Sequence, residues 1–221
     1  MNHRLNFISS GGSDALTRRP FYHPKPTYET FPKRKPFTSS SIPDRKTVLE
    51  FGFNYALEHL GLSPKELNLT FVFTDPANVT HLYFKHLING IEVNNHHAGV
   101  HIKHLSVIAF SSSFGSPTRW SKRDSIPTVN PAIAVISEQM AIRKAVQEFN
   151  VPARDYLIKR KYIELPDGTL VYTYVIQLKD RKNWLQVHVD ALNGKLIYSD
   201  TFDTRTRTNC SRRGFHIFSH L

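Results

Sequence analysis

The chain has 221 residues and a mass of 25.4 kDa, which is enough for one large domain or two small ones. Hydrophobic residues make up 40% of it, so the composition excludes a wholly disordered chain, and no apolar run approaches the roughly 20 residues of a membrane span. A single cysteine, Cys210, excludes a disulfide framework and a cysteine-rich zinc site, and the net charge of +11 comes mainly from the two ends.

Residues 1–45 predict an extended arm. Prolines fix φ and remove backbone donors, so regular structure is not expected where six of them occur: Pro20, Pro24, Pro26, Pro32, Pro36 and Pro43. Aromatic residues are interleaved with these prolines, and we expect the arm to lie over a surface and bury some of them: Phe21, Tyr22, Tyr28, Phe31 and Phe37. The first ten residues lack the apolar stretch of a signal peptide.

Residues 46–114 predict a first unit of one helix followed by strands. Thr47 and Glu50 have the spacing of a capping box, and Gly61 is typical of a helix end. Asn89-Gly90 is a strong hairpin signal. Alternating or β-branched patterns predict strands over five ranges: 67–73, 80–87, 91–93, 98–102 and 106–110.

The same order of elements recurs after a Ser- and Pro-rich linker at 115–130. In the second unit, 131–203, Ser137 is a candidate helix cap and Asn150 a candidate helix end. Four strand-like runs joined by short turns follow, at 156–165, 169–178, 184–190 and 195–199. Residues 204–221 are a basic tail. The sequence therefore predicts an α+β fold of two tandem units, each a helix packed on an antiparallel meander.

Motifs of enzymatic chemistry are missing from the sequence. It contains no His-Glu-x-x-His, no Gly-x-Ser-x-Gly, no phosphate-binding loop and no dinucleotide fingerprint. Cys210 lies beside arginines without an evident base partner. We therefore expect no catalytic residue in this chain.

Twelve histidines leave a metal site as an alternative, because six of them lie between His81 and His104. His97 and His101 are too far apart along one strand to share an ion, and His81 and His86 point to opposite faces. A pair on neighbouring strands could still chelate, but Glu92 is the nearby carboxylate in sequence. We expect half-exposed strand histidines and no metal.

The basic charge leaves a second alternative, a polyanion-binding protein. Residues 1–50 hold nine basic and four acidic residues, and the tail carries four arginines. Candidate basic runs are Lys33–Lys35 and Lys159–Lys161. No nucleic-acid-binding motif accompanies them, so the sequence does not favour nucleic acid as a partner.

Residues 80–93, THLYFKHLINGIEV, resemble the core motif of the pro-region of fungalysins, which are secreted fungal zinc metalloproteases. Residues 94–102 and 107–114 look like the two strands that follow that motif. Residues 166–178, 183–185 and 189–196 resemble the second pro-subdomain, and residues 13–31 look like the arm of the basidiomycete branch. The sequence departs from the family pattern at His86, where the family has glutamine, and in lacking the catalytic domain.

The resemblance implies cystatin- or PepSY-like subdomains and a pro-segment of a zymogen. Such a segment binds the catalytic domain of a fungalysin-type metalloprotease as folding assistant and inhibitor, outside the cell and without a membrane. It also implies that zinc belongs to that catalytic domain, so that this chain has no cofactor. The resemblance places candidate docking residues at Tyr83, Lys85, His86, Asn89, Gly90, Val93, Trp184, Asp190 and Gly194. A truncated product without function remains a further alternative.

Overall fold

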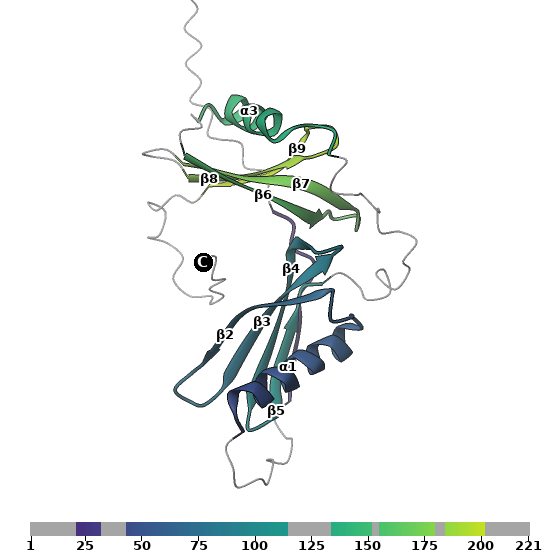
Figure 1. Cartoon of the computed structure of the whole chain (residues 1–221), viewed down its shortest axis with the longest axis vertical. Coiled ribbons are helices and arrows are strands. Elements are labelled where there is room, and N and C mark those ends of the chain that lie inside the picture. Colours follow the sequence, from purple (N-terminus) through teal and green to yellow (C-terminus); the bar gives the residue numbers. More distant parts are fainter. Residues whose placement is uncertain (1–20, 32–42, 115–133, 152–154, 180–183, 202–221) are drawn as a thin grey trace, which may run out of the picture.

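The computed structural model describes residues 21–31, 43–114, 134–151, 155–179 and 184–201. Within these ranges the chain forms two helices and nine strands (Figure 1). The helices are α1 (Arg45–Leu60) and α3 (Glu138–Phe149). The strands are β1 (Thr27–Thr30), β2 (Leu67–Thr74), β3 (Thr80–Ile88), β4 (Ile91–Lys103), β5 (Ser106–Ser112), β6 (Asp155–Glu164), β7 (Leu170–Lys179), β8 (Trp184–Asp190) and β9 (Leu196–Thr201).

Helix α1 begins two residues before the predicted start. The Asp44 carboxylate accepts the Thr47 backbone N–H at 2.8 Å and the Thr47 hydroxyl at 3.1 Å. Asp44 is therefore the N-cap, and the prediction of a capping box opened by Thr47 was wrong. Gly61 ends the helix as predicted, because its φ of 65° is a left-handed conformation that glycine adopts without steric cost.

Helix α3 has the predicted ends. The Ser137 hydroxyl accepts the Met140 backbone N–H at 3.2 Å, and Asn150 ends the helix at φ 50°. All residues between these two ends, Glu138–Phe149, are helical. Across the part of the chain that the structure describes, neither helix combines the length and apolar character that a membrane span requires.

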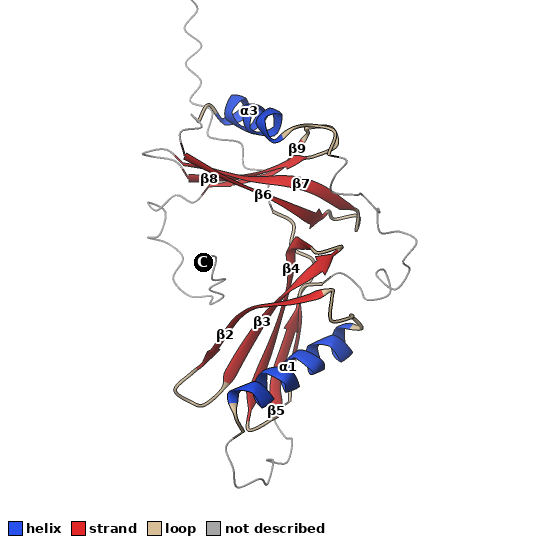
Figure 2. Ribbon diagram, viewed as in Figure 1, coloured by secondary structure: helices blue, strands red, loops and turns tan. Residues whose placement is uncertain are grey.

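All nine strands belong to one sheet. Figure 2 shows its two parts, with β2–β5 in the lower part and β6–β9 in the upper part. Hydrogen-bonded neighbours run in the order β1-β5-β4-β6-β7-β8-β9, while β3 pairs with β4 and β2 with β3. Every pairing is antiparallel except that of β4 with β6, which is parallel through Val93 and Tyr162. We call the neighbourhood of this pairing the junction, because it joins β1–β5 to β6–β9.

The prediction of an α+β fold built from two tandem helix-and-meander units was wrong. Strands hold 51% of the described residues and helices 20%, and the strands form a single mixed sheet. The runs 91–93 and 98–102 are not separate strands but parts of the 13-residue strand β4. Asn94, Asn95 and His96 resemble turn residues in sequence, yet their side chains find partners inside the fold, so the strand continues through them.

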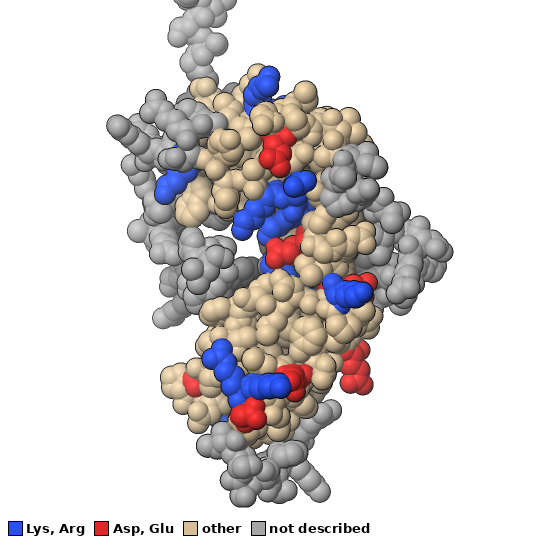
Figure 3. Space-filling view, in the orientation of Figure 1, with Lys and Arg blue, Asp and Glu red and all other residues tan. Residues whose placement is uncertain are grey.

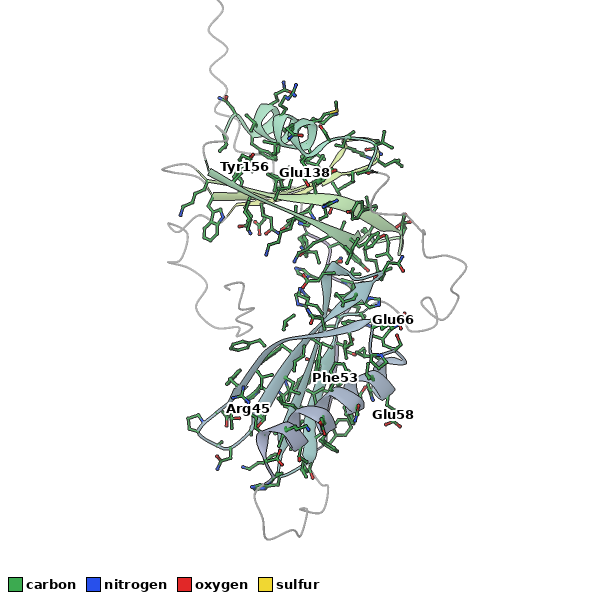
Figure 4. The ribbon with its side chains drawn as sticks, viewed as in Figure 1. Arg45, Phe53, Glu58, Glu66, Glu138 and Tyr156 are labelled. Carbon is green, nitrogen blue, oxygen red and sulfur yellow. The ribbon has the colours of Figure 1, made fainter. Side chains whose placement is uncertain are left out.

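Two clusters of buried apolar side chains lie against the helices. Helix α1 lies close to the sheet, since a Cβ at Gly52 would come within 2.7 Å of Ile102 and 2.8 Å of Leu82. Phe53 packs near Phe84 with ring centroids 6.0 Å apart, whereas Glu58 lies on the outer side of α1 (Figure 4). The second cluster lies between α3 and the β6–β9 part of the sheet and includes Val93 from β4. The β3–β4 hairpin therefore contributes side chains to both cores.

The described part of the arm lies on the sheet. Contrary to the prediction of no regular structure, residues 27–30 form strand β1, which pairs with β5. The Phe21 ring lies 4.3 Å from that of Tyr198. Tyr28 is exposed and Phe31 is half-buried. Phe37, the linker at 115–130 and the tail at 204–221 lie outside the described residues.

Candidate functional site

The face of β2–β4 turned away from α1 carries exposed aromatic side chains, and we call it the open face. Phe71, Phe73 and Tyr83 are 45%, 37% and 36% exposed. Their ring centroids lie 5.7 to 6.3 Å apart, so they form one contiguous patch. Single exposed apolar residues are ordinary on protein surfaces, but a contiguous patch is typical of an interaction site.

A β-bulge in β2 explains why Leu69 and Phe71, which are two residues apart, face opposite sides of the sheet. Leu69 pairs with Phe84 and Phe71 with Tyr83, so Thr70 is an extra residue in the ladder. Leu67 and Leu69 therefore pack in the α1 core, whereas Phe71 and Phe73 emerge on the opposite face. The Thr70 hydroxyl donates to the Tyr83 carbonyl at 3.0 Å.

A glycine lies beside the central tyrosine of the patch. Gly99 on β4 lies directly opposite Tyr83 on β3. A Cβ at Gly99 would come within 2.9 Å of the Ser111 hydroxyl and 3.6 Å of the Tyr83 ring. A side chain at Gly99 would thus crowd the Ser111 hydroxyl on β5, whereas it would make only ordinary contact with the Tyr83 ring.

A histidine pair borders the open face. His81 and His101 lie opposite each other on β3 and β4, and their Nδ1 atoms are 2.7 Å apart. The other ring nitrogen of His81, Nε2, lies 3.2 Å from Asp75 Oδ2. Phe73 stacks on His81 with centroids 4.5 Å apart and planes 10° from parallel. Burial, and then the neighbouring His81, lower the pKa of His101.

At the end of the open face near the junction lies a half-buried lysine. Lys85 donates to the Asn94 carbonyl at 3.1 Å and lies 3.0 Å from His97 Nε2. Burial, followed by the charge of Lys161, lowers the pKa of Lys85 to about 7, although Glu92 acts in the opposite direction. Burial and the Lys85 charge lower the pKa of His97 to about 3. Lys85 is therefore partly uncharged near neutral pH.

A second histidine pair lies inside the junction. His86 and His96 are 2% and 0% exposed, and their Nδ1 atoms are 3.0 Å apart. His96 Nε2 lies 2.5 Å from Glu164 Oε2, in a pair whose side chains are 0% and 3% exposed. Burial lowers the pKa of His96 despite the opposing effect of Glu164, and burial together with His96 lowers the pKa of His86 to about 3. Both imidazoles are thus neutral.

Asn95 ties β4 to the end of β6. Its side-chain amide donates to the Glu164 carbonyl at 2.8 Å, and its side-chain oxygen accepts the Glu164 backbone N–H at 3.0 Å. The same amide donates to the Tyr22 carbonyl at 3.1 Å. One buried side chain therefore supplies hydrogen bonds that a strand neighbour would otherwise make.

Basic side chains gather where the two parts of the sheet meet (Figure 3). They belong to the run Lys159–Lys161, which lines an open groove together with Glu92 and Glu138. Lys161 Nζ lies 2.7 Å from Glu92, and Arg160 Nε lies 3.8 Å from Glu138. Two cations of this run therefore face carboxylates, which reduces the attraction that the groove offers a polyanion.

The structure divides the predicted docking residues among several places. Tyr83 and Lys85 lie on the open face, whereas His86 and Val93 are buried at the junction. Asn89 and Gly90 form the turn between β3 and β4, with φ of 52° and 78°.

Three further docking candidates lie in the β6–β9 part. Trp184 begins β8, with Lys179 Nζ 5.7 Å from its ring centroid. Asp190 ends β8, and its carboxylate accepts the Leu192 backbone N–H at 2.7 Å. Gly194 stands at φ 72° before β9. The nine residues therefore do not form one surface.

Sequence reasoning missed Phe71 and Phe73 as surface residues, because their spacing from Leu67 and Leu69 indicates one face of a regular strand. It also missed Asn95 and Glu164, which lie 69 positions apart. No local sequence pattern identifies Phe71 and Phe73 as exposed, or Asn95 and Glu164 as residues in contact. For the histidines of β3 and β4, the sequence did indicate that two of them could pair across neighbouring strands. It did not indicate which ones pair.

The fungalysin resemblance assigns zinc to the catalytic domain of that family and not to this chain. Among them, no group of three or more His, Cys, Asp or Glu side chains converges as a metal centre requires. The full sequence also lacks a His-Glu-x-x-His motif. We therefore derive no catalytic step through zinc.

Comparison with known proteins relates the chain to secreted proteases, although no family model matches it. Extracellular metalloproteinase 3 of Trichophyton equinum is 24% identical over 155 residues, covering 58% of this chain and 23% of that protein. Extracellular metalloproteinase 2 of Phaeosphaeria nodorum is 27% identical over 142 residues, covering 55% and 22%. The chain thus spans less than a quarter of the length of these relatives.

Among solved structures, the C-terminal domain of YpeB from Bacillus megaterium resembles the chain with a TM-score of 0.40 and 14% identity, covering 79% of this chain and 70% of that one. The sequence comparisons confirm the coarser part of the prediction, which is similarity to extracellular metalloproteinases over about half of the chain.

Proposed function

We propose that the chain is a pro-segment that binds the catalytic domain of an extracellular metalloprotease of the fungalysin type, assists its folding and keeps it inactive. The chain itself performs no catalysis. The proposal includes secretion, a basidiomycete type of pro-region and the division into pro-subdomains at 46–114 and 131–203. It is supported by similarity that covers 22–23% of the relatives' length, as a segment attached to a larger enzyme would.

The observation that carries the proposal is the aromatic patch of the open face. Phe71, Phe73 and Tyr83 expose apolar area that α1 leaves uncovered on the other side of the sheet. Aromatic side chains are over-represented among the residues that dominate binding energy at protein interfaces. Of the predicted docking residues, Tyr83 belongs to this patch, and the half-buried Lys85 lies on the same face of β3.

An inhibition assay tests the proposal. The purified chain is added to the active extracellular metalloproteinase of Trichophyton equinum or Phaeosphaeria nodorum, and peptide hydrolysis is followed. We expect saturable inhibition. Replacing Phe73 and Tyr83 together by serine should raise the inhibition constant about 30-fold or more, the size of a lost hot spot of about 2 kcal/mol.

Leu192→Ser is the matched control, because Leu192 is 62% exposed and lies in the β8–β9 connection, away from the patch. It should inhibit like the unchanged chain. Circular dichroism confirms that each variant is folded. Failure to slow either protease at the highest soluble concentration, or equal inhibition by all variants, would contradict the proposal.

A further inference from the structure

The histidine pair at the edge of the open face has the geometry of a chelate. His81 and His101 approach from neighbouring strands with their Nδ1 atoms 2.7 Å apart and their rings at 71° to each other. Two ring nitrogens aimed at one point can share a proton or can share a cation. Neutral imidazole is a common ligand of zinc, copper and nickel.

Asp75 prepares His81 for ligation. Its Oδ2 lies 3.2 Å from His81 Nε2, so the Nε2–H donates to the carboxylate and Nδ1 carries a lone pair, which accepts from His101 Nδ1 and can instead bind a metal ion. Asp75 is itself held in place, because its Oδ1 accepts the backbone N–H groups of Ala77 and Val79 at 2.9 Å each. A carboxylate that fixes the tautomer of a ligating histidine is a recurrent feature of metal sites.

Little movement separates the observed pair from a ligand pair. Zinc–nitrogen bonds of about 2.0–2.1 Å at a tetrahedral angle place the two nitrogens about 3.3 Å apart, which requires the imidazoles to separate by roughly 0.6 Å. His101, which donates to His81 without metal, would then carry its proton on Nε2. The His81 side chain is 19% exposed, so water can reach the pair and complete the coordination.

We infer that His81 and His101 form a binding site for a divalent transition-metal ion, with Asp75 as the residue that positions His81. The site has two protein ligands, unlike the three or four of a catalytic or structural centre, and the remaining positions belong to solvent. It is independent of the proposed inhibitory function.

Titration of the full chain with zinc chloride tests this site. Histidine side-chain ¹H–¹⁵N spectra identify the ring nitrogens that respond, and calorimetry gives the affinity. We expect saturable shifts of the His81 and His101 Nδ1 signals. His81→Gln and His101→Gln should each abolish the response of the remaining partner, and Asp75→Asn should weaken binding about 10–100-fold.

Asp75→Asn is informative because it keeps Oδ1 for the turn amides, so the local fold is retained. His104→Asn is the control for a histidine outside the pair. His104 is exposed in the β4–β5 turn at φ 49°, a conformation that asparagine tolerates. Its replacement should leave the affinity unchanged. No response of His81 and His101 at millimolar zinc, or undiminished binding after either is replaced, would overturn the inference.

Discussion

The same arrangement of a carboxylate and two imidazoles occurs twice between neighbouring strands β3 and β4. On the open face, Asp75 contacts His81, which contacts His101; at the junction, Glu164 contacts His96, which contacts His86. In both triads the carboxylate fixes the tautomer of the central ring, and the two Nδ1 atoms meet. The two triads therefore consist of the same kinds of side chains, and they differ in how deeply those side chains are buried.

Burial decides what each triad can do. The junction rings are nearly parallel, with planes 2° apart, and Phe114 lies 5.1 Å and 5.5 Å from them. They are almost inaccessible, so solvent cannot complete a metal's coordination there. The rings on the open face stand at 71° and keep contact with solvent. The comparison indicates that the junction triad stabilises the fold, whereas the triad on the open face is available for ligands.

Of the single substitutions, removing the carboxylate at the junction should have the largest effect on stability. Glu164→Ala removes the hydrogen bond between the buried His96 Nε2 and Glu164 together with packed atoms, so we expect a loss of about 3 kcal/mol in the free energy of unfolding. Asp75→Asn on the open face should cost less than about 1 kcal/mol, since a partly exposed pair contributes little. Urea denaturation measures both, and equal losses would remove the distinction between the triads.

Acid should destabilise the molecule mainly through the junction. His188 on β8 lies next to the junction, with its Nε2 atom 3.4 Å from the side-chain amide of Asn94 on β4. The pKa values of His86, His97 and His188 are lowered to about 3 from the ordinary 6.5, so the unfolded chain binds more protons between these values. The stability is then fully present above pH 6.5 and falls as the pH approaches 3, by up to about 1.4 kcal/mol per pH unit for each group.

Urea midpoints between pH 7.5 and 4.5 measure this dependence. His188→Gln should make it shallower, because it removes one of the three strongly shifted groups. His101→Gln should change it less, since the shift of His101 is smaller in its more open setting. A pH dependence that His188→Gln leaves unaltered would argue against the junction as its source.

Lys85 should make the stability depend on pH in a higher range, above pH 7. Its pKa is about 7 in the folded chain and 10.5 when unperturbed, so the stability that it contributes is lost as the pH falls from 10.5 towards 7. The unfolding free energy should therefore rise by about 1 kcal/mol per unit between pH 7 and 9, and Lys85→Met should flatten that rise. Lys103→Met, at an exposed position of β4, is the control and should keep the rise.

Sequence patterns predicted local features well. Gly61, Ser137, Asn150 and the Asn89-Gly90 turn are where the structure has helix ends and a hairpin, because each acts through backbone groups within a few residues. The histidines of β3 and β4 were recognised as candidates, but their pairing depends on register.

The long-range contacts within the sheet could not be predicted from local sequence patterns. The parallel contact of Val93 with Tyr162 and the amide contacts of Asn95 with Glu164 join residues 69 positions apart, without a local signal. Polar residues in the middle of β4 therefore predicted a break where the strand in fact continues. The open face was not predicted for a different reason. Thr70 is one extra residue in β2, and because of it Phe71 and Phe73 face the side opposite to Leu67 and Leu69.

Deleting Thr70 should have only a small effect on stability and tests this explanation directly. Without Thr70, regular alternation still places Leu69 in the α1 core and Phe71 on the open face, because those residues already pair with Phe84 and Tyr83. The cost should be about 1 kcal/mol or less, mainly the hydrogen bond from the Thr70 hydroxyl to the Tyr83 carbonyl.

Deleting Asn68 is the matched control within the same strand. It shifts Leu67 by one position, so this buried side chain turns out of the core, and we expect a loss of about 2 kcal/mol or more. Urea denaturation distinguishes the two deletions. If removing Thr70 were as damaging as removing Asn68, the bulge would be needed for folding itself. Its role would then extend beyond setting which face of the sheet presents Phe71 and Phe73.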